Sequence, residues 1–162
     1  MPADLRRFAR DLASLRVGVV DANVLIYHLE ELAEYSDLTA AIVDRAARGG
    51  CRIVMSALTV AEVLAGPYRE TDTRKVERAA NFLTGIPNGE IADLTLAVAD
   101  RAAWLRRFGL RMPDAVVMAT AITSRADAIL TNDPVFRKQI PGAPRVMLLD
   151  DYTGGGPRPR GR

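Results

Sequence analysis

The stretch VGVVDANVLI, residues 17–26, decides the fold of this chain. Its first four residues form a short apolar run, which is typical of a strand buried on both faces of a parallel sheet. Asp21 closes this strand, and the apolar residues after it predict a helix over 22–29. A buried strand that passes through an acid into a helix is the expected first unit of an α/β domain.

Further strands and helices alternate along the rest of the chain. Short apolar runs predict strands at 52–55, 128–130 and 145–149. Apolar residues at helical spacing predict helices that contain residues 38–46, 59–64, 76–83, 94–105 and 115–122. The helix over 59–64 is expected to end at Gly66-Pro67. This alternation predicts an α/β class with a central parallel sheet and helices on both faces.

Length and composition are those of an ordinary globular domain. The 162 residues are 49% hydrophobic and carry a net charge of +2, and residues 1–152 are expected to form one domain. Within it, an amphipathic helix over 1–15 leads into the first strand. Residues 153–162, rich in Gly, Pro and Arg, are expected to form a flexible basic tail.

The expected compartment is the cytoplasm. A single cysteine, Cys51, excludes an intrachain disulfide, which suits a reducing setting. The first residues lack the apolar core and the cleavage site of a secretion signal. No apolar run is long enough to span a bilayer, so we expect no membrane partner.

Four acids stand where apolar runs end or where helices begin: Asp21, Glu62, Asp114 and Asp133. The carboxyl ends of parallel strands lie on one edge of a sheet together with helix N-termini, so these side chains are expected to converge. Converging carboxylates repel one another unless a hard cation sits between them. Mg²⁺ takes oxygen ligands and keeps several waters, so one or two direct carboxylates suffice. The pattern predicts a metal-dependent site that cleaves phosphodiesters.

Each acid also has a structural interpretation. Asp21 is placed to cap the helix after it, and Asp114 follows a proline at a helix N-terminus, where negative charge is favourable. Thr59 and Glu62 fit a capping box, and Asp133 precedes a proline as turn residues do. Structural caps do not require an acid at all four places, because Ser, Thr or Asn caps as well. The set as a whole therefore favours a metal site.

Polar neighbours of the acids fit the same site. Asn23 and Thr131 are candidates for positioning the scissile phosphate, although a helix cap and a strand end would also explain them. Asn132 competes with Asp133 for the fourth position. His28, the only histidine, is expected at the surface or at the edge of the core rather than as a base.

Three basic residues lie close in sequence to the acids: Arg111, Arg137 and Lys138. They are candidates for holding flanking phosphates, and ordinary solvated charge is the alternative. The chain has no His/Cys cluster of the kind that binds zinc. It also has no Gly-rich phosphate loop, which argues against a nucleotide-hydrolysing switch.

Four segments in order resemble the PIN-domain nucleases. They are the opening stretch 17–26, SALTVAEVLAG at 56–66, DAVVMATA at 114–121 and LTNDPVF at 130–136. The resemblance covers residues 17–149, nearly the whole chain. Among stand-alone PIN proteins, the chain is similar to the toxin of VapBC-type toxin–antitoxin pairs. The resemblance implies a Rossmann-like fold, dependence on Mg²⁺ or Mn²⁺, RNA cleavage, homodimerisation and inhibition by a small antitoxin.

The hypothesis for the site is metal-assisted hydrolysis of single-stranded RNA. Asp21 and Asp114 are expected to hold the main cation directly. Asp133 is expected to hold it through water or to serve a second ion, while Glu62 orients or helps to deprotonate the attacking water. Asn23 and Thr131 complete this set as positioning residues.

Two other functions compete with this hypothesis. One is an aspartyl-phosphate phosphatase of the haloacid dehalogenase type, which also begins with a strand that ends in Asp. Its usual second acid is replaced here by Asn23, and no well-placed lysine follows. The other is a non-catalytic PIN-like module that binds RNA or a partner protein.

Overall fold

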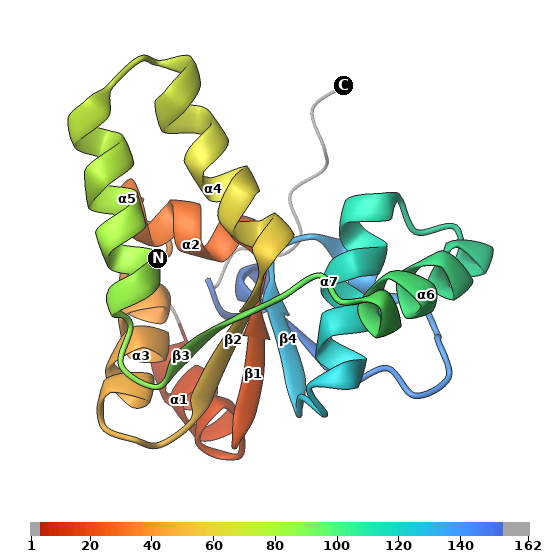
Figure 1. Cartoon of the computed structure of the whole chain (residues 1–162). Coiled ribbons are helices and arrows are strands. Elements are labelled where there is room, and N and C mark those ends of the chain that lie inside the picture. Colours follow the sequence, from red (N-terminus) through yellow and green to blue (C-terminus); the bar gives the residue numbers. More distant parts are fainter. Residues whose placement is uncertain (1–3, 154–162) are drawn as a thin grey trace, which may run out of the picture.

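A five-stranded, fully parallel sheet forms the centre of the molecule in a computed structural model that describes residues 4–153 (Figure 1). Its order is β3-β2-β1-β4-β5. The strands are β1 (Val17–Val20), β2 (Arg52–Ser56), β3 (Gly89–Ala92), β4 (Ala128–Thr131) and β5 (Arg145–Leu148). In register, Val19 lies between Val54 of β2 and Ile129 of β4. The opening stretch of the sequence thus provides the central strand, as predicted.

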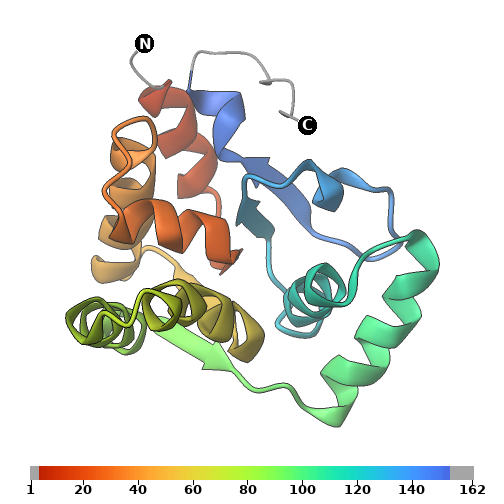
Figure 2. The same ribbon diagram turned by 90° about the horizontal axis from the view of Figure 1, so that it is seen from above.

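Helices cover both faces of this sheet, which confirms the predicted α/β Rossmann-like class. Figure 2 shows α6 and α7 together on one side of the sheet, away from α1, α2 and α3. The helices are α1 (Leu5–Ala13), α2 (Ala22–Leu29), α3 (Ser36–Ala47), α4 (Ala57–Arg69), α5 (Thr73–Gly85), α6 (Leu96–Leu105) and α7 (Met112–Thr123). Three 3₁₀ turns complete the described chain: η1 (Arg106–Phe108), η2 (Pro134–Arg137) and η3 (Leu149–Tyr152).

Side chains alternate along the central strands between two apolar cores. Val19 and Ile129 point into a core shared with α6 and α7, whereas their neighbours Val20 and Leu130 point into a core shared with α1 to α5. All four are fully buried. Because successive strand residues face opposite ways, a slip of one residue would exchange the two cores. The double burial therefore fixes the register of β1 and β4.

The structure differs from the prediction at two elements, β3 and α4. Strand β3 was not predicted, because its first three residues are exposed on the sheet edge and carry no alternating pattern. Helix α4 begins at Ala57 rather than at residue 59, and it runs through Pro67 to Arg69 instead of ending at Gly66. It packs against α2 and α5, and this packing outweighs the cost of a proline within a helix.

The predicted capping box at the start of α4 is also wrong. Ser56 is the N-cap, and its Oγ accepts a hydrogen bond of 2.9 Å from the Thr59 amide. Glu62 lies within the helix, so its carboxylate does not cap the helix start.

The two ends of the described chain pack together. Helix α1 confirms the predicted leading helix, and its Phe8 ring meets the Tyr152 ring edge-on at 4.9 Å. Thr153 is buried and donates through Oγ1 to the carbonyl of Asp150 at 3.2 Å. The rest of the predicted tail, 154–162, lies outside the described residues. Between residues 4 and 153, no helix has both the length and the apolar character to cross a membrane.

At the amino edge of the sheet, Asp127 joins β1 to β4. Its carboxylate accepts hydrogen bonds from the amides of Arg16 and Val17, at 2.7 and 2.9 Å. These two bonds hold the pKa of Asp127 below its usual value. The contribution of Asp127 to stability is therefore fully present above pH 3.8, and it is lost as pH falls through the lowered pKa.

Asp127→Asn is expected to lower the free energy of unfolding at pH 7 by at most about 1 kcal/mol, because a charged acceptor binds more strongly than a neutral one and solvent screens this exposed group. Urea unfolding at pH 7 and pH 3 measures the change. The difference between the two proteins should narrow at pH 3, where the wild-type carboxylate also begins to lose its charge. Asp100→Asn, at an exposed acid on α6, is the control. An equal difference at both pH values would contradict this account.

Candidate active site

The strand order reverses at the centre of the carboxyl edge of the sheet. From β1 the chain builds β2 and β3 on one side, and it then crosses over to build β4 and β5 on the other. In parallel sheets, ligands bind at such a reversal of strand order. Asp21 directly follows β1, and Asp133 lies two residues beyond the end of β4.

The Asp21 carboxylate is buried at this point of the sheet edge and is held by three donors. Its Oδ1 accepts from the Ala22 amide at 2.8 Å, as an N-cap does. Its Oδ2 accepts from Thr131 Oγ1 and from Asn23 Nδ2, both at 2.7 Å. The side chain is thus fixed from its own helix and from the neighbouring strand.

Asn23 and Thr131 also tie together the segments that follow β1 and β4. The Asn23 side chain accepts from the Asn132 amide at 3.0 Å. Thr131 Oγ1, fully buried, accepts from the Asp133 amide at 3.0 Å while it donates to Asp21. The two residues predicted to position a phosphate therefore orient the acids themselves.

Asp114 reaches the same region from the first turn of α7. This helix begins at Met112 with a proline next, which suits a helix start. The Asp114 side chain is only 12% exposed, and its Oδ2 lies 3.3 Å from Nε of Arg111, whose own side chain is 78% exposed. A strongly exposed partner of this kind provides weak stabilisation.

Glu62 and Asp133 also interact electrostatically with acids of this site. Glu62, half-buried on α4, has a raised pKa because of burial first and then because of the charges on Asp21 and Asp114; Arg111 opposes the rise. Asp133 caps η2 by accepting from the Val135 amide at 2.9 Å.

The charges on neighbouring acids also affect the pKa of Asp21. Burial raises its pKa most, the hydrogen bonds from Thr131 and Ala22 oppose this, and the charges on Asp114 and Asp133 raise it further. Asp21 thus interacts with acids from three other segments of the chain, because Asp114 and Asp133 raise its pKa and its own charge raises the pKa of Glu62. A bound cation would offset the repulsion between these carboxylates.

The donor set of this site is chemically suited to a hard cation. All four acids offer carboxylate oxygens, which Mg²⁺ and Mn²⁺ prefer. Within residues 4–153, no group of three or more Asp, Glu, His or Cys side chains is arranged to hold a metal ion as it stands. A magnesium ion needs only one or two direct carboxylates, because water completes its shell. Asp21 and Asp114, the two buried acids, are the residues best placed to provide them.

The predicted basic residues divide between the site and the scaffold. Arg111 lies at the site beside Asp114. Arg137 forms an ion pair with Asp151, and Lys138 donates to the carbonyls of Phe108 and Gly109. Two of the three candidates for flanking phosphates are thus engaged in joining parts of the fold.

His28 lies at the edge of the core, as expected, away from the acids. Its ring stacks on Phe82 at 4.9 Å and shares a hydrogen bond of 3.2 Å with Thr39. Burial first, and then the charge on Arg78, lower its pKa.

A second polar cluster beside the site was missed at the sequence level. The Asn132 side chain donates to Tyr35 and Asp150 and accepts from the Asp150 amide, with distances of 2.9 to 3.1 Å. Tyr35 also donates to Asp150 at 2.7 Å. Asn132 therefore fastens the end of β4 to the end of β5, which leaves Asp133 as the acid that acts on Asp21. The two partners of the Asn132 side chain, Tyr35 and Asp150, come from distant segments, so no local pattern could have revealed them.

Thr131→Val, which nearly preserves volume, is expected to lower the free energy of unfolding by about 1–3 kcal/mol, because a charged acceptor loses a buried donor. Urea unfolding at neutral pH measures this. The matched control is Thr120→Val, since buried Thr120 donates only to a carbonyl of its own helix, 2.8 Å away. Equal losses in the two variants would show that Thr131 has no special role in holding Asp21.

Three solved structures share this fold. A chain of VapBC2 from Rickettsia felis, solved with a DNA fragment from the promoter, has a TM-score of 0.65 and 17% identity over 82% of this chain and 98% of its own. A toxin–antitoxin complex from Klebsiella pneumoniae gives 0.59 and 24%, covering 82% and 97%. DNA-bound VapBC from Salmonella typhimurium gives 0.58 and 21%, covering 83% and 98%. At these identities the likeness concerns the fold.

The family is shown by a comparison of sequences. No curated protein matches the chain at a significant level. The family model named PIN domain matches residues 18–139, which include all four acids and the whole of β1 to β4 except Val17. The chain therefore belongs to the PIN domain family, a family of nucleases.

Proposed function

We propose that this protein is a metal-dependent endoribonuclease that cleaves single-stranded RNA. The observation that carries the proposal is the electrostatic interaction of buried Asp21 with Glu62, Asp114 and Asp133 at the carboxyl edge of a PIN-domain sheet. Membership of this family also removes the aspartyl-phosphate phosphatase from consideration.

Each acid has a proposed role in hydrolysis. Asp21 and Asp114 hold Mg²⁺ or Mn²⁺ directly, and Asp133 contributes through water or at a second ion. When bound, the ion lowers the pKa of the attacking water and neutralises charge that develops on the phosphate. Glu62 orients the water and takes its proton as the water oxygen bonds to phosphorus. The bond from phosphorus to the leaving ribose oxygen breaks, and that oxygen takes a proton from solvent. Its raised pKa suits a group that must accept a proton.

Asn23 and Thr131 act as positioning residues in this proposal. Both donate to Oδ2 of Asp21, while Oδ1 accepts from the Ala22 amide at the start of α2. Both oxygens of the carboxylate are therefore fixed in direction. An acid held in this way loses little conformational freedom when it binds an ion. Neighbours of this kind commonly alter metal affinity or activity by about 10- to 100-fold.

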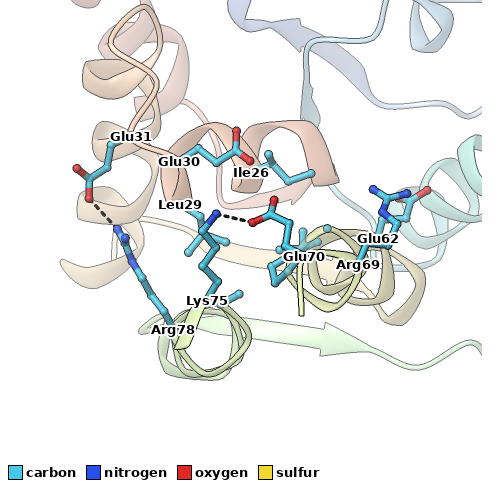
Figure 3. Close-up of a pocket in the computed structure, with 13 residues that line it drawn as sticks. Ile26, Leu29, Glu30, Glu31, Glu62, Arg69, Glu70, Lys75 and Arg78 are labelled. Atoms are coloured by element: carbon cyan, nitrogen blue, oxygen red, sulfur yellow. Dashed lines mark hydrogen bonds and ion pairs between the residues drawn. The ribbon is translucent and has the colours of Figure 1, made fainter. Parts of the chain in front are cut away.

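We further propose that the protein is the toxin of a type II toxin–antitoxin pair and acts in the cytoplasm. The structures with the same fold were solved as VapBC and toxin–antitoxin complexes. The antitoxin is proposed to occupy a pocket of about 660 Å³ between α2, α4 and α5, with Ile26, Leu29 and Val63 among its apolar lining (Figure 3). Glu62 also lines this pocket, so a segment seated there would reach the active site.

The charges of this pocket indicate the chemistry of its occupant. Lys75 is paired with Glu70 at 2.5 Å, and Arg78 with Glu31 at 2.7 Å, as the dashed lines in Figure 3 show. Glu62 remains as an acid that a cation from the partner could neutralise. A short apolar segment that carries a basic side chain would fit. Homodimerisation, which the family resemblance implies, remains a prediction that sedimentation velocity can test.

Asp21→Asn and Asp114→Asn are each expected to reduce cleavage of single-stranded RNA by more than about 100-fold, because each removes a proposed direct ligand rather than a supporting residue. Cleavage by the purified protein with Mg²⁺ or Mn²⁺ measures activity, and calorimetric titration with Mn²⁺ measures metal binding. Both variants should also bind Mn²⁺ more weakly.

Asp100→Asn serves as the charge-matched control for both measurements. Full activity in either site variant would remove that residue from the inner shell of the metal. A wild-type protein that binds RNA, but neither binds Mn²⁺ nor cleaves, would favour the non-catalytic module instead.

Gly66→Phe is expected to block the antitoxin by filling the pocket. Gly66 lines the pocket, and a Cβ added there meets no atom within 4 Å, so the fold has room for the substitution. Complex formation with a candidate antitoxin, measured by calorimetry, should weaken by at least tenfold, which is about 1.4 kcal/mol. RNA cleavage should persist.

Gly85→Phe is the matched control, because a Cβ at Gly85 also meets nothing within 4 Å and Gly85 lies outside the pocket lining. Unchanged binding by Gly66→Phe would place the partner elsewhere.

A further inference from the structure

A basic and aromatic surface extends from the active site along the end of α6. Residues 101–111 contain four arginines and no acid. All four arginines are exposed. Within the described part of the chain, Arg101, Arg106 and Arg107 form no ion pair. We call this the α6–η1 surface; it consists of Arg101, Trp104, Arg106, Arg107, Phe108 and Arg111.

Trp104 lies at the centre of this surface. Its half-buried ring packs on the core beneath and meets Phe108 edge-on at 5.0 Å. The guanidinium carbons of Arg101 and Arg107 lie 5.5 and 5.9 Å from the centre of the indole ring. An aromatic ring flanked by arginines offers stacking planes for bases beside charges for phosphates.

The surface is held in place and leads directly to the acids. Lys138, on the neighbouring η2 segment, donates to the carbonyls of Phe108 and Gly109 at 2.9 and 3.0 Å. Gly109, with φ of +74°, ends η1 in the left-handed conformation that glycine favours. Arg111 lies four positions after Arg107, a span of at most about 14 Å. Arg111 contacts Asp114, so a few nucleotides of single strand would connect Trp104 to the site.

The opposite approach to the site differs in charge. In the pocket beside α4 and α5, Lys75 and Arg78 are already paired with glutamates. An RNA phosphate would have to compete with those acids, whereas on the α6–η1 surface it would meet Arg101, Arg106 and Arg107, which form no ion pair within the described residues. Electrostatics therefore favour approach over α6 and η1.

We propose that the α6–η1 surface binds the nucleotides that flank the cleaved bond, with its arginines on the phosphates and Trp104 stacked on an unpaired base. This inference rests on the proposed ribonuclease function and specifies how its substrate is held. Stacking requires a base that is free of pairing, which selects single-stranded RNA.

Trp104 is the only tryptophan of the chain, so its fluorescence reports on this surface directly. The full-length protein is titrated with a single-stranded RNA oligonucleotide in EDTA, where binding is separated from cleavage. The expected result is quenching that saturates with RNA. The same sequence annealed into a duplex should quench much less, and equal quenching by the duplex would overturn stacking.

Arg106→Gln/Arg107→Gln tests the phosphate contacts by anisotropy of labelled RNA. The slope of log affinity against log salt should fall by about 0.7 for each arginine removed. Arg6→Gln/Arg10→Gln, which removes two exposed arginines from α1 on the other face, should leave the slope unchanged. Trp104→Leu should weaken binding about 5- to 150-fold.

Equal affinities in the two double variants would overturn the proposal even if the protein cleaves RNA. Conversely, binding that depends on these arginines in a protein that cleaves nothing would refute the nuclease alone. If Arg106→Gln/Arg107→Gln instead dissociates a dimer in sedimentation velocity and leaves RNA affinity intact, the surface joins two copies of the chain and the proposal fails.

Discussion

The buried carboxylate of Asp21 is the constraint on which the rest of the site depends. Burial and the charges on Asp114 and Asp133 disfavour its ionised form, while hydrogen bonds from Thr131 and Ala22 favour it. The fold therefore maintains a group that is electrostatically unfavourable without a cation. Groups that destabilise the fold locally in this way are typical of functional sites, where they are retained for their chemical role. The two apolar cores on either side of β1 and β4 provide the stability that tolerates it.

The strands buried on both faces could be predicted from the sequence, whereas the edge strand β3 could not. Strands β1 and β4 appear as apolar runs because each of their faces meets a core. Edge strand β3 is largely exposed, so its residues follow no pattern. Helix α4 continues through Pro67 because contacts with α2 and α5 compensate for a local cost. Such contacts join distant residues and leave no local signal.

The same distinction applies to the site. The positions of Asp21, Asp114 and Asp133 follow from strand order, because acids at strand ends and helix starts gather on one edge of a parallel sheet. Glu62 approaches this edge from within α4. What the sequence could not provide was the partner of each polar group. Asn132, an apparent alternative to Asp133, is fastened to Tyr35 and Asp150, and Lys138 supports η1. These pairings depend on side chains brought together only by the complete fold.

Helix α4 carries both Glu62 and part of the lining of the pocket between α2, α4 and α5. It is anchored at its first turn, where Ser56 caps it, and it bears Glu62 midway and Arg69 at its far end. At 1.5 Å per residue, these positions lie about 9 and 20 Å from the anchor. A stiff helix pivoting at its base would move Glu62 by somewhat less than half of any sideways displacement of its tip. In such a pivot, a large displacement of the outer end would reach the Glu62 carboxylate as a small one.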